Sequence, residues 1–226
     1  MILVKPYFRI LNLSGGLGII EEAGRTCYKS EGKIDPDSAR DFVLGILRRG
    51  HESVIEHSLV TVRIICDRGV THEIVRHRLA SYSQESTRYC DYSGGVTFVI
   101  PPWVKIEPGE YKITWKGIRG NDIDPAPYKS MEDSWWFWSM ALAERNYRKL
   151  MLLGWTPQQS RSVLPDSLKT EIVMSCNFRE WRHFFKLRTS KAAHPQMREI
   201  AVPMLKEFQR IIPVIFEDIN KEDKEE

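Results

Sequence analysis

The sequence has 226 residues, of which 42% are hydrophobic and 28% are charged, and its formal net charge is only +3 at pH 7. This composition excludes a disordered or fibrous chain and leaves enough length for one domain with a well-buried core. The small net charge also argues against a protein that coats nucleic acid non-specifically. We expect a single domain over residues 1–220 and a charged, disordered tail at residues 221–226.

The cysteines and the apolar runs narrow the setting of the protein. None of the four cysteines forms a CxxC pair, so a zinc site is not expected and the reduced cytoplasm is the simplest compartment. The apolar run at residues 2–13 contains Lys5 and Arg9 and lacks a small-residue cleavage site, which indicates a strand and not a signal peptide. No apolar run is long enough to span a membrane.

Hydrophobic periodicity and turn residues predict a mixture of strands and helices along the chain. We expect strands at residues 2–13, 58–67, 94–102 and 171–176. We expect helices at residues 19–27, 35–50, 69–78, 129–153, 156–165 and 177–188, and after Pro195. The polar stretch at residues 103–128, broken by prolines and glycines, is expected to be a surface excursion. The mixture indicates an α+β fold with a twisted, mostly antiparallel sheet flanked by helices.

Several of the predicted helices carry capping or packing signals. Asp35 or Asp37 can cap the helix at residues 35–50. Asn177, with Glu180 three residues later, gives a capping pattern for the helix that follows it. The long helix at residues 129–153 is predicted to face the core with Trp135, Trp138, Leu142, Leu150 and Met151.

The segment RHRLASYSQESTRY, at residues 76–89, is the strongest candidate for a binding site. It combines three arginines and a histidine with several hydroxyl side chains, and it contains one acid, Glu85. One guanidinium group can bind two phosphate oxygens through two parallel hydrogen bonds, and hydroxyls and loop amides add neutral hydrogen-bond donors. Glu73, Arg76 and His77 are spaced to share one face of the helix at residues 69–78. The serine-rich part is expected to form a loop after this helix.

A solvated surface is the alternative interpretation of this segment. Polar residues on later helices could instead complete a pocket for two phosphorylated ligands: Arg161, Asn177, Arg179, His183 and Arg188. The segment HESVIEH, at residues 51–57, could suggest a metal site, but His51 and His57 are six residues apart, which fits no usual ligand spacing. We therefore expect it to line a polar pocket.

The pattern RHR, seven residues, then Ser is met by Arg76, His77, Arg78 and Ser86, and it resembles the signature of the flavin-dependent thymidylate synthases. HESVIEH, the SVLP run after Arg161 and the segment NFREWRHFFKLR resemble the same family in the same order. The resemblance extends from about residue 20 to about residue 205.

This resemblance implies a cytoplasmic homotetramer that binds FAD at subunit interfaces and converts dUMP to dTMP. Methylenetetrahydrofolate gives the one-carbon unit and NADPH reduces the flavin, while no metal, nucleic acid or membrane is implied. The implied FAD contacts are Ser53, Arg76, His77, Arg78, Gln84, Asn177, Arg179 and His183. The implied dUMP contacts are Glu73, Ile74, Val75, Arg76, Gln84, Glu85, Ser86, Thr87, Arg88, Arg161 and Arg188.

Arg188 is the residue for which the resemblance implies a catalytic role, because a fixed cation there would face the uracil ring and stabilise its developing negative charge. The chain has no Pro-Cys pair of the kind that supplies the nucleophile in the classical thymidylate synthases, so no cysteine nucleophile is expected. Ser86 is expected to bind phosphate, because no general base is evident beside it.

The sequence departs from the family's common pattern at two places. Many members have Asn-Glu where this chain has Ser83 and Gln84, and the acid follows one place later as Glu85. This puts in doubt any role for a carboxylate at position 84. Cys27 stands where a serine is common, and we expect it to be a small packing residue.

Two other functions remain open from the sequence. The basic segment, with Tyr82, Tyr89 and Tyr92, could bind single-stranded nucleic acid by stacking and phosphate contacts, although the modest net charge argues against this. An enzyme that uses flavin for another reduction is the third possibility. The flavin spectrum of the purified protein, and its response to dUMP, would separate the three.

Overall fold

The computed structural model describes residues 1–116, 120–122 and 126–219, and it divides into two compact units that are each assembled from separate stretches of chain. The first unit contains residues 1–7, 65–72 and 84–172. The second contains residues 8–64, 73–83 and the chain from residue 173 onward. Both contain helices and strands, which confirms the α+β class, whereas one domain over residues 1–220 stays a prediction. The predicted tail at 221–226 lies outside the described residues.

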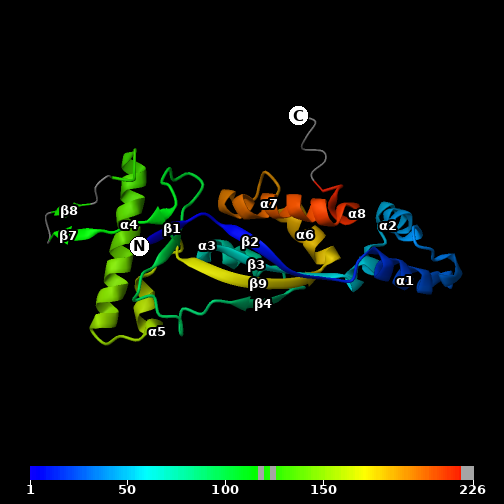
Figure 1. The fold of residues 1–226 in the computed structure, drawn as a ribbon, viewed down its shortest axis with the longest axis horizontal. Helices are drawn as coiled ribbons and strands as arrows, with labels where there is room; N and C mark the ends of the chain where they lie inside the picture. Colours follow the sequence, from blue (N-terminus) through cyan, green and yellow to red (C-terminus); the bar gives the residue numbers. More distant parts are fainter. Residues whose placement is uncertain (117–119, 123–125, 220–226) are drawn as a thin grey trace. The chain divides into compact units, whose positions relative to one another are not determined.

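The first unit is built on a small mixed sheet and one long helix (Figure 1). β1 (Ile2–Val4) pairs in parallel with β5 (Thr97–Val99) and antiparallel with β6 (Gly109–Glu110). The core between this sheet and α4 (Met131–Leu152) includes Phe98 and Phe137, which are fully buried. The unit also contains the hairpin β7 (Thr114–Lys116) and β8 (Gly120–Asp122), α5 (Pro157–Ser160) and the 3-10 helix η3 (Arg161–Val163).

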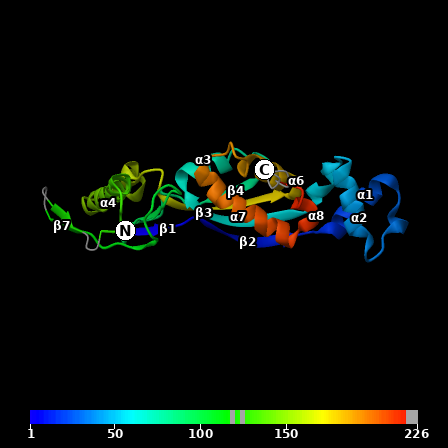
Figure 2. The same ribbon diagram turned by 90° about the horizontal axis from the view of Figure 1, so that it is seen from above.

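The second unit contains most of a four-stranded sheet with the strand order β2–β3–β9–β4. These strands are β2 (Tyr7–Ser14), β3 (Leu59–Asp67), β9 (Lys169–Asn177) and β4 (Ser81–Gln84). Figures 1 and 2 show α7 (Pro195–Ile211) and α8 (Pro213–Phe216) over one face of this sheet, with α6 (Phe178–Arg188) beside them. The remaining elements of this unit are α1 (Leu17–Tyr28), η1 (Glu31–Lys33), α2 (Ser38–Arg48) and η2 (Glu52–His57). The helix α3 (Arg68–Ile74) lies mostly within the residues of the first unit.

Aromatic packing fixes the position of α6 in the second unit. The indole Nε1 of Trp181 donates to the carbonyl oxygen of Val60 on β3 at 3.1 Å. Around the fully buried Trp181 lie the rings of Phe184, Phe185 and Phe208. Each large ring removes apolar area from water, and the indole hydrogen bond fixes the rotation of the helix against the strand. The face of α6 that carries the candidate site residues is therefore held in one orientation.

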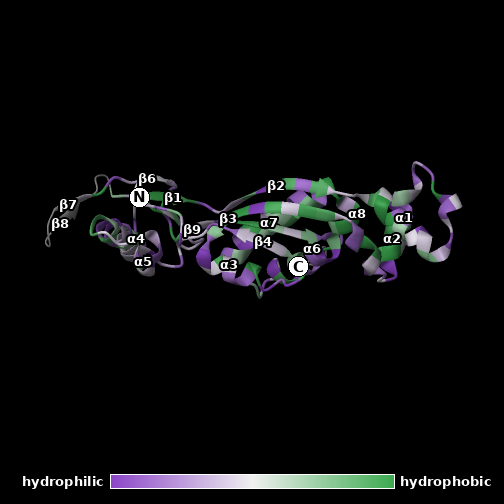
Figure 3. Cartoon of the chain, turned by 90° about the horizontal axis from the view of Figure 1, so that it is seen from below, coloured by the Kyte–Doolittle hydropathy of each residue, from purple (hydrophilic) through white to green (hydrophobic). Residues whose placement is uncertain are grey.

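Apolar side chains are exposed on two neighbouring strands of this sheet, β2 and β3. Leu11 and Leu13 of β2, and Leu59 at the start of β3, are each more than 40% exposed. Figure 3 shows hydrophobic residues along β2, which is the edge strand. Among the described residues, no helix has the length and apolar character needed to cross a membrane.

Several local predictions are confirmed and others are corrected. The strand expected at residues 58–67 is β3, and the helix expected at 177–188 is α6, with the Oδ1 of Asn177 accepting from the amide of Glu180 at 2.9 Å. The strand expected at 2–13 is interrupted at Pro6, which has no amide hydrogen to pair, so it forms β1 and β2. Part of the surface excursion at 103–128 forms β6, β7 and β8, and part lies outside the described residues.

The predicted cap of α2 is wrong in its chemistry. Asp37 stands at the N-cap position, but its side chain makes no capping hydrogen bond. The carboxylate of Asp35 instead accepts from the amide of Asp37 at 2.9 Å, so it closes the turn that precedes the helix. Cys27, expected to pack, is exposed on α1.

The predicted core stripe of the long helix is also partly wrong. Trp135 and Leu142 are 71% and 47% exposed. The inward face of α4 instead carries two buried acids, Asp133 and Glu144, which a hydrophobic pattern does not register. The buried apolar side chains of α4 include Phe137, Met140 and Tyr147.

Candidate functional site

The segment at residues 76–89 has a different backbone from the one expected. α3 ends at Ile74, and the amide of His77 donates to the carbonyl of Ile74 at 3.1 Å, which closes a turn. Arg76 and His77 therefore lie beyond the helix, and the predicted shared helical face with Glu73 is wrong. The serine-rich part is not a loop but the strand β4. The hydroxyl of Tyr82 donates to the carbonyls of Ile74 and His77 at 2.8 and 2.7 Å, so it holds the turn against β4.

The predicted site residues fall into two groups, one within each unit. The group in the second unit comprises Ser53, Glu73, Ile74, Val75, Arg76, His77, Arg78, Asn177, Arg179, His183 and Arg188. The group in the first unit comprises Gln84, Glu85, Ser86, Thr87, Arg88 and Arg161.

Arg188 is held at three points in the second unit. Its Nη1 donates to a carboxylate oxygen of Glu73 at 2.8 Å, and its Nη2 donates to the Glu73 carbonyl at 3.0 Å. Its Nε donates to Nε2 of His77 at 3.1 Å. Bonds from a guanidinium to a carboxylate are short and strong, and two-point contacts also fix the plane of the group. The cation at the end of α6 is therefore fixed in place before any ligand binds.

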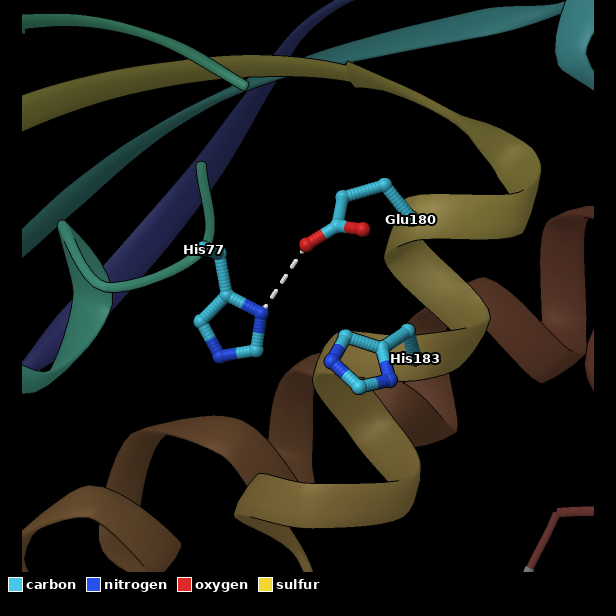
Figure 4. Close-up of side chains that lie close together, drawn as sticks. All are labelled: His77, Glu180 and His183. Carbon is cyan, nitrogen blue, oxygen red and sulfur yellow. Dashed lines mark hydrogen bonds and ion pairs between the residues drawn. The ribbon is translucent and has the colours of Figure 1, made fainter. Parts of the chain in front are cut away.

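His77 lies between Arg188 and a buried acid that the sequence analysis identified only as part of a capping pattern. His77 is 3% exposed, and its Nδ1 lies 3.0 Å from a carboxylate oxygen of Glu180. Figure 4 draws this contact as a dashed line. Burial, helped by the charges of Arg188, His183 and Arg76, lowers the pKa of His77 to about 4. Burial raises the pKa of Glu180. His77 is therefore a neutral imidazole at physiological pH.

A pocket of about 460 Å³ lies beside this cluster in the second unit. Its lining residues are Glu52, Glu56, Leu79, Asn177, Arg179, Glu180, His183 and Lys186. The expectation that HESVIEH lines a polar pocket is thus confirmed for its two acids. Arg179 donates to Glu56 at 2.6 Å, so a ligand phosphate would have to compete with this carboxylate for it.

The other predicted residues of the second-unit group differ in solvent exposure and in whether their side chains are ion-paired. Arg76 and Arg78 are exposed, and within the described chain their side chains make no ion pair. Ser53 and Val75 are also exposed, whereas Ile74 is fully buried and can offer a ligand only its backbone. The two free guanidinium groups are therefore the available anion-binding groups beside His77.

Glu180, His77 and His183 could in principle hold a metal ion, because their ligand atoms lie within 4.8 Å of one another. Both ring nitrogens of His77 are already engaged, however, one by Glu180 and one by Arg188. The charges of Arg188 and Arg76 also act on this ring. Positive potential and occupied ligand atoms both disfavour a cation, so the cluster fits a hydrogen-bonded network better than a metal centre.

The group in the first unit brings arginine and hydroxyl groups together. Arg161 donates to the hydroxyl of Thr87 at 3.0 Å, and Arg88 donates to the amide oxygen of Gln158 at 2.8 Å. The hydroxyl oxygen of Ser86 accepts from the amide of Arg88 at 3.3 Å, at the end of β4. Both arginines are exposed and pair with neutral partners, so their charges remain available to a ligand.

Glu85 and Gln84 have separate sets of partners. Glu85 accepts from the hydroxyl of Tyr92 at 2.7 Å and from Lys169 at 3.1 Å. Although burial disfavours the ammonium, hydrogen bonds to Glu171 and Glu85 raise the pKa of Lys169, so it stays charged. Glu85, the acid that lies one place later in this chain than in many family members, therefore forms an ion pair within the protein.

Gln84 is anchored on hydroxyl groups. Its Nε2 lies 3.1 Å from the hydroxyl oxygen of Thr71 and 3.3 Å from that of Thr170. The hydroxyl of Thr71 itself donates to the carbonyl of Arg68 at 2.8 Å, so it can only accept from the amide. This leaves the side-chain carbonyl of Gln84 as the end that a ligand can meet.

Sequence reasoning missed Glu180 and the acids and lysine of the pocket as site residues. A signal was present for Glu180, because it and His183 are three residues apart on one helix and so lie on one face. Its partner His77 is 103 residues away in the sequence, and no local pattern reports that contact.

Comparison with known proteins gives one family and one fold. A family model described as "Thymidylate synthase complementing protein" matches residues 9–214. The flavin-dependent thymidylate synthase of Mycobacterium sp. (strain JLS) is 34% identical over 207 residues, covering 90% of this chain and 80% of the relative. That of Mycobacterium marinum (strain ATCC BAA-535 / M) is 34% identical over 211 residues, with the same coverage.

A solved structure, the UMP/dUMP methylase PolB from Streptomyces cacaoi bound with 5-Br dUMP, is similar with a TM-score of 0.75. It is 22% identical, and the match covers 96% of each chain. At this identity the likeness shows a shared fold.

Proposed function

The chain belongs to the thymidylate synthase complementing family, the flavin-dependent thymidylate synthases, and we propose that it is a methyltransferase that converts dUMP to dTMP. In this proposal methylenetetrahydrofolate donates the carbon unit, NADPH is the reductant and FAD is the cofactor. Bound FAD supplies the hydride chemistry that no side chain can perform. The chain's own residues bind, orient and polarise the ligands.

The residues of the second unit fit a flavin dinucleotide. Arg76 and Arg78 offer unpaired guanidinium groups for phosphate oxygens, and the pocket of about 460 Å³ lies beside the His77 and His183 rings. Asn177 uses its side-chain oxygen as the cap of α6 and keeps its amide hydrogens for a ligand. We assign FAD to this group, together with Ser53, Arg179 and His183.

The residues of the first unit fit the phosphate of dUMP. Ser86 and Thr87 offer hydroxyls, and Arg88 and Arg161 offer charge on neutral partners. Gln84, whose Nε2 is held by Thr71 and Thr170, keeps its side-chain carbonyl as a hydrogen-bond acceptor. We assign dUMP to this group, with Glu73, Ile74, Val75 and Arg76 as further contacts, and Glu85 as a support held by Lys169.

The observation that carries the proposal is the fixed guanidinium of Arg188. Three of its donors are bound to Glu73 and His77, which holds a positive charge at a defined point. A preorganised cation stabilises negative charge as it develops on a reacting ring, without reorganisation during the step. We therefore propose Arg188 as the catalytic residue that faces the uracil.

Two of the four cysteines, Cys66 and Cys176, are poorly suited to act as a thiolate nucleophile. Burial raises the pKa of the thiols of Cys66 and Cys176, so neither is ionised at neutral pH. The tyrosines count against the nucleic-acid alternative. Tyr82 and Tyr92 use their hydroxyls within the protein and are half-buried, which leaves Tyr89 as the exposed ring of the three. A stacking surface needs several exposed rings.

We also propose a homotetramer with FAD at the subunit interfaces, in the cytoplasm. The exposed Leu11 and Leu13 on the edge strand β2, and Leu59 on the neighbouring strand β3, are candidates for burial against another chain. Light scattering of the purified protein measures the subunit count, and a monomer would exclude this assembly.

The function is tested with purified protein and Arg188→Ala. We expect a flavin absorbance band in both proteins, a spectral change on adding dUMP to the wild type, and dTMP formation in the wild type only. A wild type that binds FAD but makes no dTMP would contradict the proposed reaction. Near-normal turnover of Arg188→Ala would contradict the role of Arg188.

A further inference from the structure

Glu180 is a buried acid behind the catalytic cation. It lies in the first turn of α6, is 6% exposed, and is neither an implied ligand contact nor a partner of Arg188. Within the described chain its side chain accepts from one group, the Nδ1 of His77 at 3.0 Å. Burying a carboxylate is unfavourable unless hydrogen bonds compensate for the lost hydration, so the presence of a buried acid at position 180 calls for an explanation.

The neighbours of His77 determine which ring nitrogen carries the proton. Arg188 can only donate hydrogen bonds, and its Nε lies 3.1 Å from Nε2 of His77. Nε2 must therefore be unprotonated and accept. The hydrogen of the neutral ring then sits on Nδ1, where Glu180 accepts it. The tautomer follows from donor and acceptor chemistry alone.

We propose that Glu180 is a positioning residue for Arg188: by accepting from Nδ1 of His77 it fixes the tautomer that offers Nε2 to the guanidinium. The proposal rests on the proposed function in so far as Arg188 acts on the substrate. Glu180, His77, Arg188 and Glu73 form one chain of hydrogen bonds, and Glu180 is the end farthest from the guanidinium.

The charges around His77 agree with this arrangement. A protonated ring would direct an N–H toward Arg188, and two donors would then face each other. The charged and titratable groups that act on the ring are Arg76, Arg188, His183 and Glu180, and burial with the first three keeps the ring neutral. Without an acceptor at position 180, the ring could carry its hydrogen on Nε2, where it would repel the guanidinium.

The first test compares three replacements of Glu180. Glu180→Leu removes the acceptor, Glu180→Asp keeps the charge but withdraws the oxygen, and Glu180→Gln keeps a carbonyl acceptor at the same distance. Misplacement of a catalytic group by about 1 Å can lower a rate about 100-fold, so we expect kcat to fall about 10- to 100-fold in Glu180→Leu and Glu180→Asp. Glu180→Gln restores most of the turnover. The KM for dUMP changes little, because the dUMP phosphate is bound by other residues.

Glu21 provides a matched control on α1. It is a buried acid of the same unit, 1% exposed, and it pairs with Arg25 and Ser38 away from the candidate site. Glu21→Leu is expected to lower stability but to leave kcat per bound flavin unchanged. An equal loss of kcat in Glu21→Leu would show that loss of any buried acid suffices, and it would overturn the proposal.

The second test reads the tautomer directly and does not depend on activity. The ¹⁵N shifts of histidine-labelled protein distinguish Nδ1–H from Nε2–H, and His77→Gln identifies the signal of His77. We expect Nδ1–H in the wild type and in Glu180→Gln, and its loss in Glu180→Asp and in Glu180→Leu. An Nε2–H tautomer in the wild type would overturn the proposal even if dTMP is formed.

The two readouts separate failure of this inference from failure of the proposed function. Absence of dTMP formation in the wild type, with the expected tautomer present, counts against the reaction and supports the hydrogen-bond chain. Full turnover in Glu180→Leu or Glu180→Asp would overturn the positioning role. So would a loss in Glu180→Gln as large as that in Glu180→Asp, because the charge and not the acceptor would then matter.

Discussion

Replacing Arg188 by lysine keeps the positive charge but removes the planar fork that the protein holds at three points. A lysine ammonium is a compact point charge, so it can remain with the Glu73 carboxylate but cannot also reach the Glu73 carbonyl and His77. Two charge-assisted hydrogen bonds are then lost. Arg188→Lys therefore tests geometry separately from charge.

The expected size of the effect follows from those two bonds. Each is worth about 1.5–3 kcal/mol when a charged group takes part. The side chain of Arg188 is 15% exposed and that of Glu73 is 27% exposed, so water can replace part of the lost hydrogen bonding. We therefore take about 2–3 kcal/mol for the loss of the two hydrogen bonds together. If the whole of this free energy is lost from stabilisation of the transition state, kcat falls about 30- to 150-fold, because 1.36 kcal/mol corresponds to a factor of ten in rate.

The assay is the rate of dTMP formation per bound flavin at saturating dUMP, with the dUMP KM measured in parallel. Arg210→Lys is the control, since Arg210 pairs with Glu207 on the exposed side of α7 and takes no part in the proposed site. We expect kcat to fall while KM stays within about threefold, the pattern of an interaction made in the transition state. A kcat for Arg188→Lys within about threefold of the wild type would refute the reasoning, because charge alone would then suffice.

Three further predictions follow from other parts of the structure. The pKa of His77 rises from about 4 in the folded protein to 6.5 on unfolding, so the unfolded chain binds more protons between these two values. The free energy of unfolding should therefore rise by about 3 kcal/mol from pH 4 to 6.5. Denaturant titrations of His77→Gln should show a flatter dependence of the unfolding free energy on pH, and equal pH dependences in wild type and variant would contradict this prediction. Ser86→Ala and Arg161→Ala should each weaken dUMP binding about tenfold while leaving measurable turnover. Calorimetry measures the binding, and the rate of dTMP formation measures the turnover. Complete loss of dTMP formation in Ser86→Ala with dUMP still bound would contradict the phosphate-binding role of Ser86. Asp218→Ala removes the two-point partner of the buried Arg182, so the free energy of unfolding should fall by about 1–3 kcal/mol with flavin binding retained. An unchanged denaturation midpoint would show that the remaining partners of Arg182, Glu52 and the carbonyl of Ile215, suffice.

The features that the sequence predicts well are those with local causes. Asn177 caps α6 because its side chain reaches an amide three residues away. The segment at residues 76–89 stands out in the sequence because Arg76 and Arg78 are only two residues apart, and its role as a binding segment stays a prediction. The partners of this segment have no local signal, since Arg188 meets His77 across 111 residues.

The error in α4 has a physical cause. The inward face carries Asp133 and Glu144, which accept hydrogen bonds from the amides of Lys105 and Val96, both at 3.0 Å. Paired in this way, an acid can be buried, and a hydrophobic pattern then identifies the wrong face. Trp135 fitted the pattern but lies outside. Nothing local distinguishes the two faces, because the deciding amides belong to distant segments.

The three-point hold on Arg188 has an entropic consequence for ligand recognition. A free arginine side chain loses about 2 kcal/mol of rotamer entropy when it is ordered, and here that loss has occurred on folding. Of its five N–H groups, the described residues engage three, which leaves one on each Nη atom. A ligand thus meets two donors in one plane whose directions are already set. Binding free energy that would otherwise order a mobile side chain can instead favour a flat partner with two adjacent acceptors.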